Sequence, residues 1–184
     1  MTQRHGTSIP WRRASARTAL MLVASISFMS CGSGAGQPAT TGRASAGVGD
    51  AFAAQALEVC QTAIGSKDAW RAFPVQNFDP NHPDASAFPE VATWLEDEVG
   101  PTFDAWGDDL TALGTPPTGT AAWTEVLDAV DTIARLNADQ VTAARTGDVD
   151  AFVEATNGLH DVQPELERAT AAAGVARCAQ VHAA

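Results

Sequence analysis

The stretch Thr120–Arg145, TAAWTEVLDAVDTIARLNADQVTAAR, decides the fold. Its apolar residues return every three or four positions, which is the spacing of one face of an α-helix. Trp123, Val126, Val130 and Ile133 lie on this face, and most of the charged residues fall on the opposite one. A helix of this kind packs against a core through its apolar stripe. The pattern therefore predicts a long amphipathic helix that needs partner helices beside it.

The residues that follow predict another helix that runs back along this one. Gly147 is a typical residue at a helix C-terminus and Asp148 is a typical N-cap, so we expect a tight antiparallel connection. The next apolar stripe comprises Val149, Phe152, Leu159, Leu166 and Ala173. After Gly174, the short segment Val175–His182 is expected to carry Cys178 back toward the first helix.

Two further helices are predicted upstream. The apolar stripe of residues 89–113 stays in phase across Gly100-Pro101, which predicts one continuous helix with a kink at the proline. Residues 50–64 also have one apolar face, and this first helix is expected to end at Gly65. The proline-rich stretch between these two helices is predicted to be an irregular loop.

Together these elements predict an all-α fold, an up-and-down four-helix bundle with a kinked second helix. No stretch of the chain is a convincing β-strand. The chain has 184 residues, of which 45% are hydrophobic and 18% charged, enough for one domain with a substantial core. We assign residues 50–184 to this helical-bundle domain.

Residues 1–30 have the composition of a secretory signal peptide. Four arginines and no acidic residue precede the twelve-residue apolar run TALMLVASISFM at 18–29. This run is too short to cross a bilayer of about 30 Å as a stable helix. The sequence therefore predicts that the chain is exported.

The end of the apolar run resembles the lipobox of bacterial lipoproteins. The motif is Phe28-Met29-Ser30-Cys31, and a stretch of Gly, Ser and Ala follows it. In that family a cysteine after a small residue receives a thioether-linked diacylglycerol and becomes the mature N-terminus. The resemblance implies that Cys31 is the lipidation site and that the protein lies on the extracytoplasmic face of the cell membrane.

The bundle itself is similar to small exported lipoproteins of high-GC Gram-positive bacteria. The similarity lies in Leu-Gly-Thr-Pro-Pro at 113–117, in Gly147-Asp148 and in the spacing from Gly174 to Cys178. These residues form turns and helix caps. The resemblance therefore implies a relationship of fold and no particular activity.

The cysteines support the lipid interpretation independently, because the chain has three of them. If Cys31 carries lipid, Cys60 and Cys178 are left as one pair in an oxidising compartment. A disulfide between them would join the first helix to the C-terminal segment. Two separate buried thiols are the alternative.

Residues 31–49 are mostly Gly, Ala, Ser and Thr, and we predict a flexible tether. Without the leader, the chain has 7 basic and 22 acidic residues, a formal charge of −15. Such a surface repels anionic headgroups and nucleic acid, so no nucleic-acid partner is expected. The acidic stretch 96–98 is expected to be solvated surface. The lipid on Cys31 is therefore the expected contact with the membrane.

No motif of a common enzyme class is present. The sequence lacks an HExxH zinc motif, a CxxCH haem-attachment motif and a Walker phosphate-binding loop. His82, His160 and His182 each lack the Glu three residues upstream that di-iron bundles require. Asp79 and Asp84 lie among prolines and are expected to form turns rather than a cation site. We expect no catalytic residue, no metal site and no cofactor.

A layer of polar residues interrupts the apolar faces of the last two long helices. Asn137, Thr156 and Gln163 fall on these faces, and His160 lies at the edge. An antiparallel pairing brings Asn137 near Thr156 and His160. The layer is either the polar end of a small-molecule pocket or a hydrogen-bonded network that sets the helix register.

The leading interpretation is a lipid-anchored, extracytoplasmic helical-bundle lipoprotein that acts as a non-catalytic binding or interaction module. The sequence does not identify its protein or small-molecule partner. The alternative is a carrier of a small apolar ligand or of haem, with the pocket between the third and fourth helices.

Overall fold

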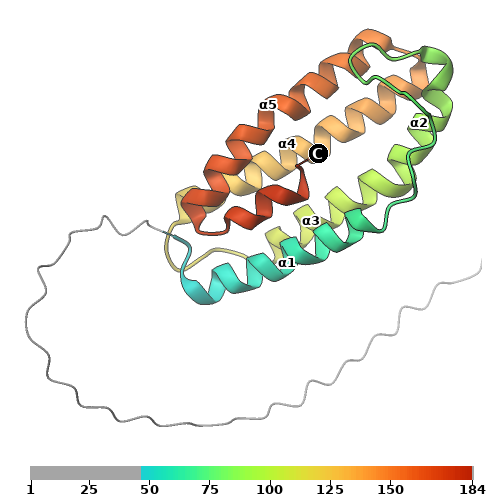
Figure 1. Cartoon of the computed structure of the whole chain (residues 1–184). Coiled ribbons are helices and arrows are strands. Elements are labelled where there is room, and N and C mark those ends of the chain that lie inside the picture. The colour runs from blue at the N-terminus through green and yellow to red at the C-terminus, as the bar shows by residue number, and fades with distance from the viewer. Residues whose placement is uncertain (1–46, 184) are drawn as a thin grey trace, which may run out of the picture. The chain divides into compact units, whose positions relative to one another are not determined.

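The computed structural model of the chain describes residues 47–183. The predicted signal peptide, the predicted lipidation site Cys31 and most of the predicted tether lie outside the described residues. The elements in the described part are α-helices α1 Asp50–Asp68, α2 Phe88–Trp94, α3 Gly100–Ala112, α4 Thr120–Thr146 and α5 Val149–Ala173, the π-helical turn η2 Leu95–Val99, and two 3₁₀ segments, Ala85–Ala87 and Ala176–Val181 (Figure 1). Within residues 47–183 there is no strand, so the predicted all-α class is confirmed.

Helices α4 and α5 form an antiparallel hairpin, as their connection predicts (Figure 1). Gly147 adopts the left-handed conformation with φ of 73°, which a side chain would make costly. The Asp148 carboxylate then accepts a hydrogen bond from the backbone N–H of Ala151 at 3.0 Å and caps α5. The stripe residues Trp123, Val126, Ile133, Phe152 and Leu166 are all buried.

Helical residues continue without a break from α2 through η2 to α3. In η2 the Gly100 N–H donates to the Leu95 carbonyl, five residues back, so the turn is wider than in an α-helix. Pro101 follows immediately and has no N–H to donate. The wide turn therefore lies where the proline interrupts the normal hydrogen-bond ladder.

Helix α1 continues past Gly65 to Asp68, beyond its predicted end. A glycine inside a helix costs only about 1 kcal/mol relative to alanine. The Ser66 hydroxyl donates to the Thr62 carbonyl at 3.1 Å, within the last turn of the helix. The extension matters because it places Lys67 beside the C-terminal end of the chain.

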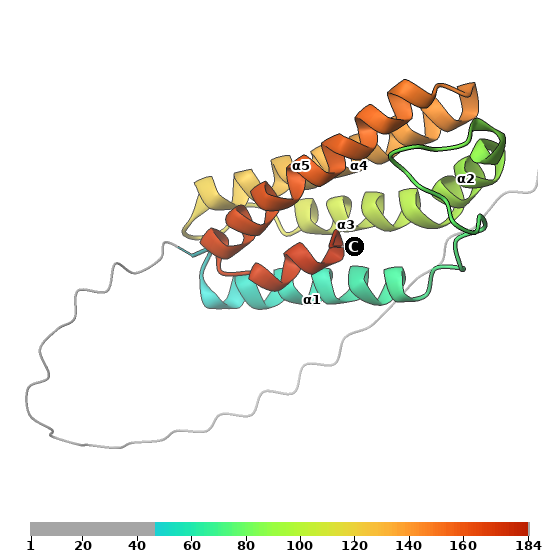
Figure 2. The same ribbon diagram turned by 45° about the horizontal axis from the view of Figure 1, so that its top comes forward.

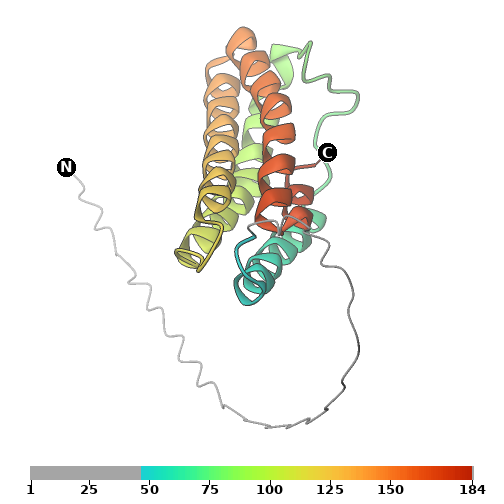
Figure 3. The same cartoon turned by 90° about the vertical axis from the view of Figure 1, so that its left-hand side faces the viewer.

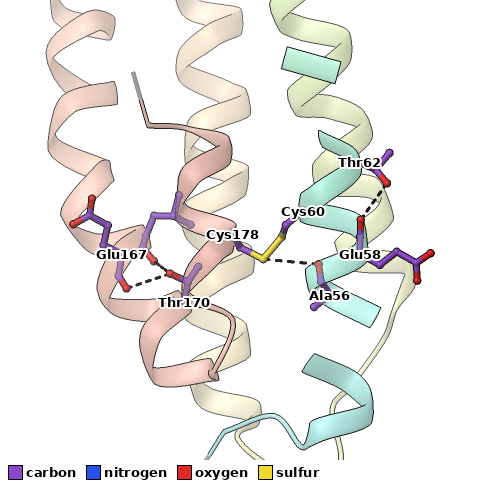
Figure 4. Close-up of a disulfide and its surroundings, with 8 residues drawn as sticks. Ala56, Glu58, Cys60, Thr62, Glu167, Thr170 and Cys178 are labelled. Carbon is purple, nitrogen blue, oxygen red and sulfur yellow. Dashed lines mark hydrogen bonds between the residues drawn. A yellow bond between two sulfur atoms is a disulfide. The ribbon is translucent and has the colours of Figure 1, made fainter. Parts of the chain in front are cut away.

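The C-terminal segment returns between α5 and α1 (Figure 2). Gly174 is left-handed with φ of 81°, and the Val175 N–H donates to the Thr170 carbonyl at 2.8 Å, which turns the chain back. Cys178 then forms a disulfide with Cys60 of α1, with their Cα atoms 5.1 Å apart (Figure 4). The predicted link between the first helix and the C-terminal segment is present.

Part of the predicted tether contacts the domain. Val48 is fully buried, its N–H donates to the Ala173 carbonyl at 3.2 Å, and the Thr118 hydroxyl donates to the Gly47 carbonyl at 2.7 Å. Residues 47–49 are thus held against the ends of α5 and of the 113–119 turn. Among residues 47–183, no helix combines the length and the apolar composition needed to cross a bilayer.

Candidate functional site

A cavity of about 410 Å³ lies at the junction of α2, η2 and α3 with α4 and with the loop that follows α1. Figure 3 shows this loop running from the end of α1 to α2 along one side of the helices. Fourteen residues line the cavity: Lys67, Trp70, Phe73, Phe78, Pro80, Val91, Trp94, Leu95, Val99, Phe103, Asn137, Gln140, Phe152 and His182. Most of them are apolar, and six are Phe or Trp.

The aromatic walls are held in fixed orientations. The ring centroids of Trp70 and Trp94 lie 5.5 Å apart with the planes at 85°, and Phe73 packs on Trp94 at 5.0 Å. The Trp70 indole N–H donates to Thr102 Oγ1 at 2.8 Å, and the Trp94 indole N–H donates to the Arg71 carbonyl at 3.0 Å. Both indole donors are therefore used within the protein, and the rings offer only carbon surface to the cavity.

Ion pairs hold the loop against η2. Arg71 pairs with Asp97 at 3.0 Å and with Glu98, and its pKa is raised, mainly by the hydrogen bond to Glu98. Arg145 of α4 pairs with Glu96, and this hydrogen bond lowers the pKa of the Glu96 carboxyl. The acidic stretch expected to be plain solvated surface instead connects the π-helical turn to its neighbours.

Two amides of α4 line the cavity and are almost completely buried. Asn137 is 5% exposed and Gln140 is 7% exposed. Asn137 Nδ2 donates to the Ile133 carbonyl at 2.9 Å, and Gln140 Nε2 donates to Thr156 Oγ1 at 2.9 Å. Among the described residues, Asn137 Oδ1 and Gln140 Oε1 receive no hydrogen bond. The cavity wall therefore holds two unused acceptors.

His182 lines the cavity from the C-terminal segment. Its Nδ1 lies 2.7 Å from Gln163 Oε1, and the Gln163 amide in turn donates to Glu167 at 2.8 Å. Burial, followed by the charges of Lys67 and His160, lowers the pKa of His182 from 6.5 to about 4. The ring is therefore neutral at pH 7, when Nδ1 carries the proton and Nε2 is an acceptor.

Lys67 is the other polar residue of the lining and the only lysine in the chain. Its ammonium group donates to the Ala183 carbonyl, which joins the end of α1 to the end of the described chain. Burial lowers the pKa of Lys67, and the neighbouring Asp68 partly offsets this effect.

The predicted polar layer is divided between the cavity and its surroundings. Asn137 lines the cavity, whereas Thr156 and Gln163 lie behind it and bind the lining residues Gln140 and His182. His160 is exposed and is not part of the lining. Asn137 is therefore part of the cavity wall, and Thr156 and Gln163 belong to the hydrogen-bonded network that supports it.

The position of the cavity differs from the predicted one between the third and fourth helices. Phe152 is the only residue of α5 in its lining. Helices α4 and α5 approach closely at Gly158, where an added Cβ would lie 2.9 Å from a methyl carbon of Leu136. The space lies instead where α2, η2, α3 and the loop after α1 meet α4.

Several lining residues were not recognised from sequence. Gln140 follows Asn137 by three positions on the same helix face, a spacing that would have revealed it. Lys67 and His182 are brought together only by the disulfide and the chain reversal at Gly174, for which the local pattern carries no signal.

The acidic loop residues make local turns. Asp79 accepts from the Asn81 N–H at 2.9 Å and also contacts His82, and Asp84 accepts from the Ser86 N–H at 2.8 Å. Within residues 47–183, no group of three or more His, Cys, Asp or Glu side chains is arranged to hold a metal ion.

Chemically, the cavity combines rigid aromatic walls with a few buried polar atoms, which is the usual composition of a small-molecule binding site. Comparison of the chain with family models, curated proteins and solved structures found no match. The function is therefore inferred from the geometry of this cavity and from the leader.

Proposed function

We propose that this chain is a lipid-anchored extracytoplasmic lipoprotein whose helical domain binds a small, largely apolar molecule without transforming it. The observation that carries the proposal is the aromatic cavity of about 410 Å³. Ligand sites typically measure about 300–1,000 Å³ and combine an apolar lining with a few polar groups that set orientation. The apolar lining here includes Trp70, Trp94 and Phe73. The polar groups include the side-chain amides of Asn137 and Gln140.

The proposal includes a finer description of the fold. We take the helices as an up-and-down four-helix bundle in which α2, η2 and α3 together are one bent second helix. The uninterrupted helical run from α2 through η2 to α3 supports this arrangement, because Pro101 and the wide turn before it are the place where such a helix bends.

The leader and Cys31 support the anchor. Two acyl chains are enough for stable membrane attachment, because each buried methylene contributes about 0.8 kcal/mol. The strongly acidic domain is repelled by anionic headgroups, so the tether keeps it at a distance from the membrane. The cavity is then open to ligand from the extracytoplasmic side.

Metabolic labelling with radioactive palmitate tests the anchor. We expect the full-length protein to be labelled and to fractionate with membranes, and the Cys31→Ala variant to lose both properties. Cys60→Ala is the matched control, because Cys60 is a disulfide cysteine and its loss should leave labelling unchanged. Equal labelling of the wild type and Cys31→Ala would reject the anchor.

Binding is tested separately with a panel of naphthalene derivatives, by thermal shift and by tryptophan fluorescence. A ligand raises the unfolding free energy by RT ln(1 + [L]/Kd), so the melting temperature should rise with probe concentration. Trp94→Ala should weaken this rise, whereas Trp123→Phe, in the core and outside the cavity lining, should preserve it. If no probe raises the melting temperature, a binding role is contradicted.

The alternative ligand, haem, is tested by titrating the protein with haem and following the haem absorption band.

A further inference from the structure

The most informative feature of the cavity is that its free polar atoms other than Lys67 are hydrogen-bond acceptors. They are Asn137 Oδ1, Gln140 Oε1 and His182 Nε2, and none receives a hydrogen bond from the described residues. Among the described residues, the buried side-chain atoms without a partner are Trp106 Nε1 and Trp123 Nε1, so the three acceptors of the lining are instead accessible from the cavity. A ligand that enters the cavity without donating to them removes them from water without a replacement hydrogen bond, at a cost of about 1–3 kcal/mol for each acceptor.

The orientation of each amide of α4 follows from its other partner. The Ile133 carbonyl can only accept, so the Asn137 NH₂ must face it and Oδ1 is the free atom. The Thr156 hydroxyl donates its single hydrogen to the Phe152 carbonyl at 2.9 Å. Only its lone pairs face Gln140, which fixes the Gln140 NH₂ toward Thr156 and leaves Oε1 free.

The tautomer of His182 is determined in the same way. The Glu167 carboxylate is an acceptor, so the Gln163 NH₂ must face it, and Gln163 Oε1 faces the imidazole. His182 Nδ1 therefore carries the hydrogen, and Nε2 has the lone pair. Three side chains outside the lining, Thr156, Gln163 and Glu167, thus select acceptors at the cavity surface.

Charge narrows the ligand class further. The positive charge of Lys67 in the lining disfavours a cationic ligand. Burial and this same charge also lower the pKa of His182, which keeps its ring neutral. An anion would face the two free amide oxygens and a domain of strongly negative net charge. A neutral molecule avoids both penalties.

We propose that the cavity selects neutral aromatic molecules that carry hydroxyl or N–H donors, with the ring against the wall that Trp70, Trp94 and Phe73 form and the donors on Asn137, Gln140 and His182. This inference rests on the proposed binding function and specifies its ligand. Offset and edge-to-face contacts with the fixed indole rings account for the aromatic part. The unused acceptors account for the donor part.

The test compares 2-naphthol with 2-methoxynaphthalene, which has the same ring but no donor. We expect the wild-type protein to bind 2-naphthol about tenfold more tightly, the ratio that corresponds to a difference of about 1.4 kcal/mol. 2-Naphthoate and 2-naphthylmethylammonium provide the anionic and cationic comparisons, and both should bind more weakly than 2-naphthol. Kd values are measured by fluorescence titration and by calorimetry.

Asn137→Leu should reduce the preference for 2-naphthol several-fold while retaining 2-methoxynaphthalene binding. Asn157→Leu, at an exposed position of α5, is the matched control and should keep the wild-type ratio. Circular dichroism and the melting temperature establish that each variant is folded. If Asn137→Leu does not fold, Asn137→Asp provides a second test, because its carboxylate keeps the shape and should reject 2-naphthoate more strongly than the wild type.

The outcomes separate this inference from the proposed function. Equal affinity for 2-naphthol and 2-methoxynaphthalene overturns donor selection but leaves an apolar binding site. Tightest binding of 2-naphthoate also overturns it, and would assign Lys67 the dominant role. Failure of all four probes to bind contradicts the binding function itself as well as the inference.

Discussion

At the scale of single residues, the side chains that determine the cavity's chemistry are not all in its wall. Thr156 and Glu167 lie outside the lining, yet each determines which atom of a lining amide or imidazole is free. The Thr156 hydroxyl uses its hydrogen on the Phe152 carbonyl, so it can only accept from Gln140. The Glu167 carboxylate can also only accept, so it fixes the orientation of the Gln163 amide. Substitutions behind the wall should therefore change ligand selectivity without removing any ligand contact.

Thr156→Val is the direct test of this principle. Valine cannot accept from Gln140, so the amide is free to rotate and present its NH₂ to the cavity. We expect the preference for 2-naphthol over 2-methoxynaphthalene to fall, with tighter binding of the methyl ether, whose oxygen can accept. Thr142→Val is the matched control, since Thr142 also donates to its own helix but is exposed. An unchanged preference in Thr156→Val would show that Gln140 is not oriented by Thr156.

His182 predicts how stability depends on pH. Its pKa in the folded protein is about 4, below the ordinary 6.5, so the unfolded state binds the proton more readily. This contribution to stability is complete above pH 6.5 and is lost as the pH falls from 6.5 toward 4. Its size is about 3–4 kcal/mol, because the two pKa values differ by about 2.5 and each pKa unit corresponds to about 1.4 kcal/mol. Chemical denaturation at several pH values measures it.

The matched variants for this measurement are His182→Gln and His82→Gln. Glutamine at 182 does not titrate, so the pH dependence between 4 and 6.5 should be shallower than in the wild type. His82 is exposed in the loop and is not part of the cavity lining, so His82→Gln is the control for the loss of a histidine elsewhere on the surface. Parallel slopes for the wild type and His182→Gln would contradict a buried neutral imidazole.

At the scale of elements, the loop after α1 and the π-helical turn η2 together form one side of the cavity. Arg71 at the start of the loop contacts Asp97 and Glu98 of η2, and its carbonyl accepts from the Trp94 indole. The side chains that pair with Arg71 are partly or largely exposed, and exposed ion pairs contribute little to global stability. Their effect should instead be local, on the position of the aromatic wall.

Arg71→Gln is therefore expected to weaken 2-naphthol binding several-fold while leaving the melting temperature nearly unchanged. The reason is that a loop opens locally with less free energy than the domain needs to unfold. Arg135→Gln removes an exposed ion pair with Asp139 on α4, away from the cavity, and serves as the control. A large loss of stability in Arg71→Gln, or unchanged binding, would contradict this view of the loop.

The sequence predicted the helices better than it predicted the contacts between them. The stripes around Trp123 and Phe152 indicate α4 and α5 because helical periodicity is a local property, and Gly147-Asp148 predicts their hairpin for the same reason. The cavity could not be predicted, because it is formed by residues of several elements that are far apart in the sequence. No local pattern showed that α1 would continue past Gly65 and bring Lys67 to His182.

At the scale of the whole domain, the disulfide joins the two elements that supply the cavity's titratable residues. Lys67 lies near the end of α1, about two turns beyond Cys60, and His182 lies about one turn beyond Cys178. The bridge closes a loop with a sequence separation of 118 residues. In the chain-entropy model such a crosslink contributes about 4–5 kcal/mol to the unfolding free energy. It should also keep Lys67 and His182 in the same wall.

These two effects can be separated in a Cys60→Ala/Cys178→Ala variant. We expect its melting temperature to fall, and its affinity for 2-naphthol to fall several-fold even at temperatures where circular dichroism shows it fully helical. The loss should arise because the C-terminal segment, no longer tied to α1, holds His182 against Gln163 only part of the time. 2-Methoxynaphthalene, which makes no use of the His182 acceptor, should lose less affinity than 2-naphthol. If the folded variant binds both probes as tightly as the wild type, the bridge stabilises the chain without positioning the cavity, and the link between crosslink and ligand site must be abandoned.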